Sequence, residues 1–241
     1  MKKMILATAA MAAFAGSYAQ AEDQKPEHEV SFNASIVSDY RYRGISQSRL
    51  DPALQGGADY THNPTGLYAG TWLSTIKWIK DAGGDGNIEW DIYGGKRGEI
   101  TKDVAYDVGV LTYVYPSNGL NPSANTTEIY GQLGYGPGYV KYSHSVTNLF
   151  GFADSKNSGY LDIGANVEVM QGLTLNLHAG RQRVRGPSSA ASYNDWKVGL
   201  TKDFGVVTGS VALIGTTLTV PGPDGENLGK NGLVVSVGKT F

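Results

Sequence analysis

The sequence contains no cysteine, so a fold held by disulfides is excluded, and passage through an oxidising compartment would create no cross-links. Charged residues are also scarce, at 17% of 241 residues. Beyond the N-terminal segment, no apolar run approaches the roughly eighteen residues that a membrane-spanning helix needs. The mean hydropathy of −0.25 still allows a membrane barrel, because a barrel strand exposes only every second side chain to lipid.

The first residues have the pattern of a secretory signal peptide. Lys2 and Lys3 precede an apolar run from Met4 to Gly16, and Ala19-Gln20-Ala21 has the small residues of a cleavage site. We therefore expect cleavage near Ala21 and exclude residues 1–21 from the fold. Without Lys2 and Lys3 the chain keeps 18 basic and 22 acidic residues, a balance that argues against nucleic acid as a partner.

The rest of the chain favours strands. Glycine and tyrosine are abundant, at 33 and 15 residues. Residues 22–29 show no apolar pattern and predict a flexible lead-in. From Val30 the apolar period is two, with Val30, Phe32, Ala34, Ile36, Tyr40 and Tyr42 predicted on one face and Asp39, Arg41 and Arg43 on the other. Twelve runs are predicted, at about 30–45, 53–62, 67–78, 87–96, 103–115, 126–135, 139–147, 159–169, 173–183, 193–203, 206–217 and 232–241.

The connections between these runs alternate in length. Long gaps are expected at 46–52, 79–86, 116–125, 148–158, 184–192 and 218–231, and short gaps separate the remaining pairs. An even strand number with long loops at one end and tight turns at the other is typical of outer-membrane barrels. The sequence therefore predicts an all-β, transmembrane, antiparallel up-and-down barrel over residues 30–241, in the outer membrane of a Gram-negative bacterium.

Aromatic residues and the last strand add to this prediction. Tyr42, Trp78 and Trp90 would form an aromatic girdle at the outer rim, and Tyr60, Tyr68, Phe204 and Phe241 one at the inner rim. Counting back from Phe241, alternate residues Val237, Val235 and Leu233 are apolar. This resembles the C-terminal signal that barrel-assembly machinery recognises, with Phe241 as its final residue.

A series of short segments occurs in order along the chain: Ser38-Asp39-Tyr40-Arg41-Tyr42-Arg43-Gly44-Ile45-Ser46, Gln55-Gly56-Gly57, Tyr68-Ala69-Gly70-Thr71-Trp72, Glu89-Trp90-Asp91-Ile92-Tyr93-Gly94-Gly95, Thr127-Glu128-Ile129-Tyr130-Gly131, Leu177-His178-Ala179-Gly180, Tyr193-Asn194-Asp195-Trp196-Lys197 and the closing strand. In this order the segments resemble the TorF-type porins, a proteobacterial family of hypothetical outer-membrane proteins. The resemblance covers almost all of the chain after the leader. It implies a channel-forming barrel, with no established substrate and no catalytic residues.

Residue parity places a set of charged side chains in the predicted lumen and its mouths, namely Asp39, Arg41, Arg43, Asp59, Glu89, Asp91, Asp107, Glu128, Asp162, Glu168, His178, Asp195 and Lys197. Charge rings of this kind set ion preference, and a slight acidic excess would favour cations. The alternative is that these side chains pair with one another and plug a narrow lumen.

Three arginines share the opposite parity near the outer end of the ninth predicted strand. Arg181, Arg183 and Arg185 could contact lipopolysaccharide phosphates, since the planar guanidinium suits phosphate. A solvated loop base is the competing interpretation.

The sequence offers little for catalysis. His28 lies in the lead-in, His62 at a turn and His144 on a predicted lipid face, so only His178 is placed in the lumen. Its same-face neighbours Asn176 and Gln182 are not nucleophiles. No nucleotide or zinc motif is present, and the pair Glu89 and Asp91 falls short of a calcium site. We therefore expect no enzyme, cofactor or bound metal.

The leading hypothesis is a porin or channel for passive diffusion of small polar solutes or ions. A non-conducting structural or binding barrel, with loops that contact lipopolysaccharide or another surface, remains open. So does a soluble periplasmic barrel that binds an apolar ligand. Outer-membrane lipid and the barrel-assembly machinery are the other expected partners.

Overall fold

The structure is a computed structural model that describes residues 26–241. The predicted signal peptide and residues 22–25 of the lead-in lie outside the described residues. Within 26–241, twelve strands form one closed antiparallel barrel, as predicted. They are β1 (His28–Val37), β4 (Ala53–His62), β5 (Leu67–Thr75), β6 (Ile88–Thr101), β7 (Val104–Val114), β8 (Thr126–Tyr135), β9 (Gly138–Ser145), β10 (Gly159–Met170), β11 (Leu173–Arg183), β12 (Tyr193–Asp203), β13 (Thr208–Thr216) and β14 (Gly232–Thr240).

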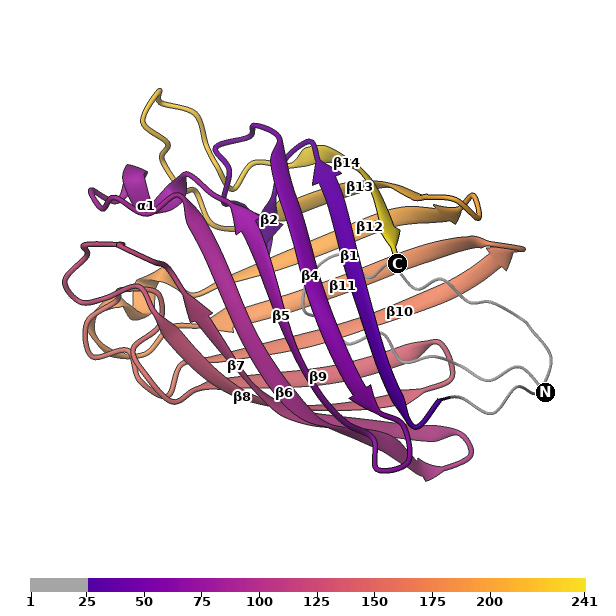
Figure 1. The fold of residues 1–241 in the computed structure, drawn as a ribbon. Coiled ribbons are helices and arrows are strands. Elements are labelled where there is room, and N and C mark those ends of the chain that lie inside the picture. The colour runs from indigo at the N-terminus through magenta and orange to yellow at the C-terminus, as the bar shows by residue number, and fades with distance from the viewer. Residues whose placement is uncertain (1–25) are drawn as a thin grey trace.

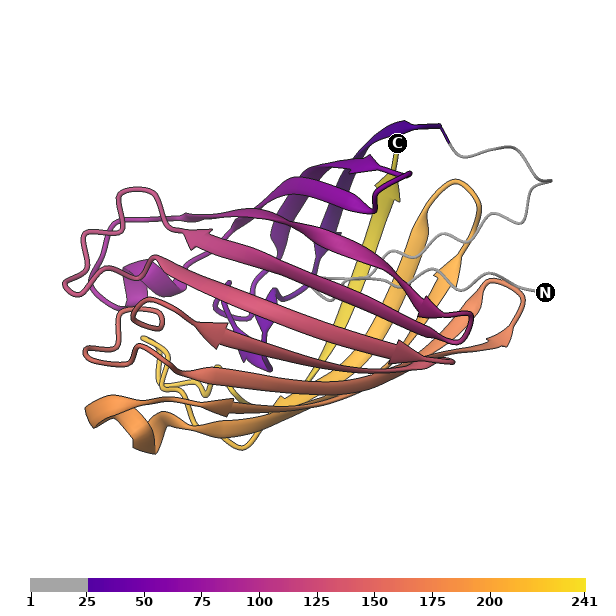
Figure 2. The same ribbon diagram turned by 90° about the horizontal axis from the view of Figure 1, so that it is seen from below.

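Each strand pairs with its neighbour in the sequence, and β1 pairs with β14 to close the barrel, with Ile36 opposite Val237. Long connections gather at one end and short turns at the other (Figures 1 and 2). The long ones are 38–52, 76–87, 115–125, 146–158, 184–192 and 217–231. They carry a short helix α1 (Trp78–Asp81) and a 3-10 helix η1 (Gly186–Ala191). Among the described residues, no helix combines the length and apolarity that crossing a membrane would require.

The outer face of the barrel is apolar. Phe32, Ile36, Ile163 and Val235 are among the large hydrophobic side chains that remain exposed on alternate strand positions. A belt of this kind needs lipid, because so much contiguous apolar surface is not left in contact with water. It speaks against the soluble periplasmic alternative.

Several predicted boundaries need correction. β1 begins at His28, inside the segment expected to be a flexible lead-in. β6 continues to Thr101, so the predicted turn at 97–102 is strand up to that point. β5 ends at Thr75, three residues before the predicted end of that run at residue 78, where α1 begins. β13 begins at Thr208, two residues after the predicted start of that run.

The aromatic girdles are only partly as predicted. Trp90, Tyr60, Phe204 and Phe241 are exposed on the outer surface. The predictions for the other three girdle residues are wrong. Tyr42 packs inside against Tyr113, Trp78 lies in α1 against Tyr115, and Tyr68 is buried in the lumen. Tyr68 is held inside by a hydrogen bond, because its hydroxyl donates to Asp107 over 2.6 Å.

The first strand is the largest correction. The alternation through Tyr40 and Tyr42 predicts a single strand to about residue 45, but β1 stops at Val37. Residues 39–48 turn into the barrel and form a small separate hairpin of β2 (Arg41–Tyr42) and β3 (Ile45–Ser46). We call residues 39–48 the lumen hairpin. Tyr40 is therefore buried within the barrel and does not face lipid.

Candidate functional site

The lumen hairpin turns at Arg43 and Gly44. Both residues have positive φ, at 45° and 82°, which is the two-residue turn that matches the twist of paired strands. Tyr42 and Ile45 pair across the turn. Glycine is required at position 44, because a Cβ there would lie 2.8 Å from the Asp195 Cβ on the barrel wall. The hairpin tip therefore lies directly against β12.

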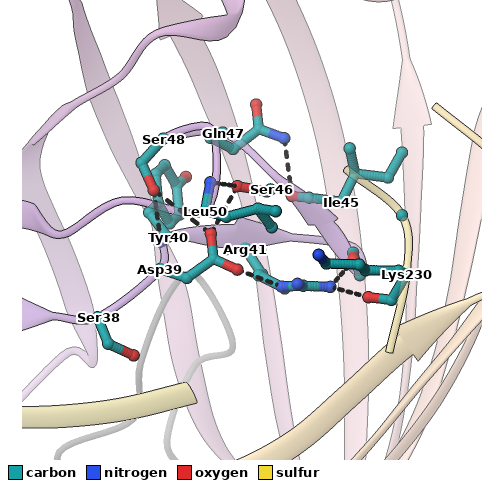
Figure 3. Close-up of polar contacts among 12 residues, drawn as sticks. Ser38, Asp39, Tyr40, Arg41, Ile45, Ser46, Gln47, Ser48, Leu50 and Lys230 are labelled. Atoms are coloured by element: carbon teal, nitrogen blue, oxygen red, sulfur yellow. Dashed lines mark hydrogen bonds and ion pairs between the residues drawn. The ribbon is translucent and has the colours of Figure 1, made fainter. Parts of the chain in front are cut away.

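Asp39 holds the base of the hairpin together (Figure 3). Its buried carboxylate accepts from the Arg41 Nε over 2.6 Å and from the Ser46 hydroxyl over 2.5 Å. The backbone N–H of Tyr40 donates to the Ser48 hydroxyl over 2.9 Å. Arg41 also donates to the Lys230 carbonyl over 2.6 Å, which links the hairpin to the last long loop. These contacts satisfy polar groups that the chain buries when it leaves the sheet.

Arg43 connects the hairpin tip to two distant strands. Its guanidinium donates two hydrogen bonds to Glu128 on β8, over 3.1 and 2.7 Å, and one to Gln182 on β11 over 2.6 Å. It also lies 4.1 Å above the centre of the Tyr160 ring. Four strands lie between β1 and β8 around one side of the barrel, and three lie between β1 and β11 around the other. Arg43 thus bridges the lumen from one wall to the opposite one.

Glu89 and Asp91 lie side by side on β6, buried next to the hairpin. The Tyr40 hydroxyl donates to Glu89 over 2.8 Å. Burial, reinforced by these two carboxylates, raises the pKa of Tyr40 well above its ordinary value, so this phenol keeps its proton and serves as a donor. Neither carboxylate oxygen of Asp91 has a hydrogen-bond partner among the described residues. When ionised, such a pair would attract small cations.

A second charged group lies further round the wall. His178 contacts Asp162 through Nδ1 over 2.8 Å and Asp195 through Nε2 over 2.7 Å. The Tyr160 hydroxyl donates to Asp195 as well, over 2.9 Å. Because both ring nitrogens of His178 face carboxylates, neither is free to take a proton from a nucleophile.

The lumen is filled unevenly. Beside β5 to β8, Tyr68 and Tyr130 fill the interior, and their hydroxyls are hydrogen-bonded to each other. Beside β9 to β14 a cavity of about 260 Å³ remains below the hairpin. Charged and amide side chains line it, among them Lys141, Asp162, Asn166, Asn176, His178, Asp195 and Lys197. Asn166 is exposed although its parity points inward, so solvent enters from the end with the short turns.

The predicted lumen residues lie in three regions: at the hairpin and cavity, nearer the short turns, and at the turn beside Gly172. Asp39, Arg41 and Arg43 belong to the hairpin, and Glu89, Asp91, Glu128, Asp162, His178, Asp195 and Lys197 surround it or the cavity. Nearer the short turns, Asp59 accepts from Tyr93 over 2.6 Å and Asp107 from Tyr68. Glu168 is apart from the others, exposed beside the turn at Gly172. Arg181, Arg183 and Arg185 are exposed at the end with the long loops.

Sequence reasoning missed several lumen residues. Lys141 is buried in the cavity wall and lies 4.0 Å from the centre of the Tyr130 ring. The alternation of Val140, Tyr142 and His144 on the outer face would have placed it inside. Parity indicates Gln182 only as a same-face neighbour of His178, whereas in the structure its Oε1 accepts a hydrogen bond from Arg43. Tyr40 could not be found, since its inward position depends on the chain leaving the sheet.

The fold is similar to solved outer-membrane porins. KdgM porin superposes with a TM-score of 0.55 at 6% identity, over 88% of this chain and 97% of that chain. NanC porin superposes with a TM-score of 0.56 at 10% identity, over 88% and 98% of the two chains. At identities this low, the superpositions show a shared fold. No curated protein sequence matches the chain.

A family model extends over almost the whole sequence, including all twelve barrel strands and the lumen hairpin. It matches residues 20–241, and the chain therefore belongs to Gcw_chp, a family of bacterial proteins of unknown function.

Proposed function

We propose that this protein is an outer-membrane channel for small polar solutes or ions, with the lumen hairpin as the element that closes it. One observation carries the proposal: the hairpin crosses a polar lumen but is not part of the barrel sheet. Arg43 holds the tip of the hairpin through side-chain hydrogen bonds to Glu128 and Gln182. Side-chain contacts can exchange for water without breaking the barrel, whereas a strand of the wall cannot leave.

The charge of the lumen supports a preference for cations. Carboxyl groups outnumber basic side chains in the described lumen wall and hairpin tip: the acidic residues are Asp59, Glu89, Asp91, Asp107, Glu128, Asp162 and Asp195, and the basic ones are Arg43, Arg97, Lys141, His178 and Lys197. An excess of one sign favours the opposite ion in a pore. The KdgM porin has been solved with oligogalacturonate. For this chain we propose only small polar solutes and ions, because the TorF-type resemblance implies a channel without an established substrate.

The remaining partners are proposals of the same kind. Phe241 would end the assembly signal, and its backbone pairs with Phe32 on β1. Arg181, Arg183 and Arg185 would contact lipopolysaccharide phosphates. Leader cleavage near Ala21 would precede insertion. We propose no enzymatic activity and no resident cofactor.

A non-conducting structural or binding barrel is the second candidate. The observation that favours it is the filled half of the lumen, where tyrosines and buried carboxylates bond with one another. In that case, deletion of loop residues 116–125 or 218–231 would reduce adhesion to lipopolysaccharide or cells and leave permeability unchanged.

Planar-bilayer recording of the purified protein distinguishes the two candidates. The test variant carries Arg43→Gln together with Glu128→Gln, because removing both charges avoids leaving one of them buried and alone. We expect a higher single-channel conductance, or more frequent openings, than in the wild type. The reversal potential in a salt gradient should show cation preference.

The control removes a different ion pair, which joins the connection 38–52 to the connection 76–87. Arg49 pairs with Asp81 outside the hairpin tip, so Arg49→Gln with Asp81→Asn should leave conductance as in the wild type. If the folded wild type and the Arg43 and Glu128 double variant are both silent, the channel proposal is wrong and the structural barrel is the better function.

A further inference from the structure

Two histidines face each other on the rim that carries the short turns. His28 begins β1 and His62 ends β4, and they are direct cross-strand partners in the β1 to β4 register. Their ring centres are 5.1 Å apart. Paired positions of this kind bring side chains together without any further loop structure. The sequence pattern alone places His28 in a lead-in and His62 at a turn, so it does not predict that they meet.

Glu27 completes the group. Its Oε1 lies 3.4 Å from the His62 Nε2 and 3.7 Å from the His28 Nε2. The candidate ligand atoms of all three residues lie within 4.8 Å of one another. Metal–ligand bonds of about 2.0–2.1 Å in a tetrahedral site set ligand atoms roughly 3.3–3.4 Å apart. The two separations from the Glu27 Oε1 are close to these values, so modest side-chain shifts would bring all three groups around one ion.

The other ring nitrogen of each histidine is already engaged. The His28 Nδ1 lies 2.8 Å from the Tyr60 hydroxyl, and the His62 Nδ1 lies 2.7 Å from the Thr65 hydroxyl. When Nδ1 carries the proton and donates it, the Nε2 lone pair is available to a metal. Outer partners of this kind orient the ligands of metal sites.

The backbone holds Glu27 in place although it precedes β1. The Asn63 N–H donates to the Glu27 carbonyl over 3.0 Å, and the Asn63 side chain donates to the Pro26 carbonyl over 2.8 Å. The backbone of Glu27 is therefore positioned by the turn between β4 and β5. This reduces the ordering that a bound ion would otherwise impose.

We propose that Glu27, His28 and His62 bind one divalent transition-metal ion on this rim. Two imidazoles and one carboxylate suit Zn²⁺ or a neighbouring first-row ion, whereas Ca²⁺ and Mg²⁺ select oxygen ligands. Three protein ligands leave a fourth position for water or an incoming ligand, as in open zinc sites. The site lies outside the lumen and does not depend on the channel proposal.

Metal titration of the folded protein tests the proposal. The mature chain is prepared without a polyhistidine tag, stripped with a chelator, and titrated with Zn²⁺, with Co²⁺ absorption as a second signal. We expect one equivalent bound by the wild type. His28→Ala and His62→Ala should each weaken binding by more than the roughly 10- to 100-fold that loss of an outer-shell partner costs. Binding should also weaken as the pH is lowered, because protons compete for the ring nitrogens.

His144→Ala is the matched control. His144 lies at the other end of the barrel on β9, where its ring bonds to Asn157 over 3.2 Å. This variant should bind Zn²⁺ like the wild type. Tyr60→Phe, which removes a partner and no ligand, should weaken binding less than His28→Ala. Heat-dependent gel mobility confirms that each variant is folded.

The proposal is wrong if the folded wild type binds no Zn²⁺ at one equivalent. It is also wrong if a variant with both His28→Ala and His62→Ala binds as tightly as the wild type, or if His144→Ala lowers binding as much as His28→Ala. The three residues would then form only an ion-paired surface group.

Discussion

Tyrosine rings inside the barrel lie over glycines of neighbouring strands. At Gly109 on β7, a Cβ would be 2.6 Å from the Tyr130 hydroxyl oxygen and 2.6 Å from the Gly94 carbonyl oxygen. At Gly95 on β6, a Cβ would be 2.6 Å from the Tyr68 hydroxyl oxygen. The abundance of glycine and tyrosine is thus one feature: missing side chains make room for the rings that fill half of the lumen.

We predict that Gly109→Ala destabilises the barrel by about 1–3 kcal/mol, because the methyl group overpacks against a backbone carbonyl and a buried ring. The midpoint of urea unfolding in detergent measures this.

Gly131→Ala on the adjacent β8 is the control. Its Cβ would meet only the Val108 side chain, at 3.9 Å, so the change should stay within about 0.5 kcal/mol. Equal destabilisation by both variants would contradict the packing described for Gly109.

At the scale of elements, the lumen hairpin is a two-stranded sheet of its own, separate from the barrel sheet. It folds into the barrel because Asp39, Arg41 and Ser46 satisfy one another there, and because the turn at Arg43 and Gly44 fits against β12. The closing loop 217–231 supports it, since the Ser46 N–H donates to the Leu228 carbonyl over 3.0 Å. Contacts to β8, β11, β12 and this loop together position one two-stranded element.

We predict that Gly44→Ala displaces the hairpin tip and raises permeability. The added Cβ would meet the Asp195 Cβ at 2.8 Å and the Gly215 carbonyl at 3.0 Å, in a backbone conformation with φ of 82°. Proteoliposomes that carry this variant should swell faster in small sugars than proteoliposomes that carry the wild type.

Gly225→Ala separates the clash from the backbone strain. Gly225 has φ of 83°, and a Cβ there would meet nothing within 4 Å. Proteoliposomes that carry this control variant should swell at the wild-type rate. A rate for Gly44→Ala that equals the wild-type rate, in folded protein, would argue against the hairpin as the closing element.

At the scale of the whole molecule, polarity is inverted relative to a water-soluble domain. Buried Glu89, Asp91 and Glu128 lie inside while Phe32 and Ile163 are exposed outside. Only a lipid environment makes this distribution stable, because it removes the apolar belt from water while the closed sheet satisfies every strand edge.

We predict that the protein fractionates with the outer membrane and migrates differently on a denaturing gel before and after boiling. The unboiled barrel stays folded in detergent, because the β1 to β14 closure leaves no edge to unravel. The boiled sample of the same preparation is the control. Recovery in the soluble periplasmic fraction, with one mobility, would contradict a membrane barrel.

The sequence by itself determined the barrel. Period-two alternation and loops of alternating length are local properties, and Leu161, Ile163 and Val167 show their outward face without any knowledge of their neighbours. The same alternation placed Glu89, Asp91, Asp162 and Asp195 inside. It would also have found Lys141.

Only the tertiary structure decided what the inward side chains do. Alternation continues through Tyr40 and Tyr42, yet the chain leaves the sheet at Val37, because contacts to Glu89, Glu128 and Gln182 from strands far away in sequence become available. His28 and His62 likewise meet through strand register. Parity tells which face a residue takes, whereas register and the path of a loop tell which partner it meets.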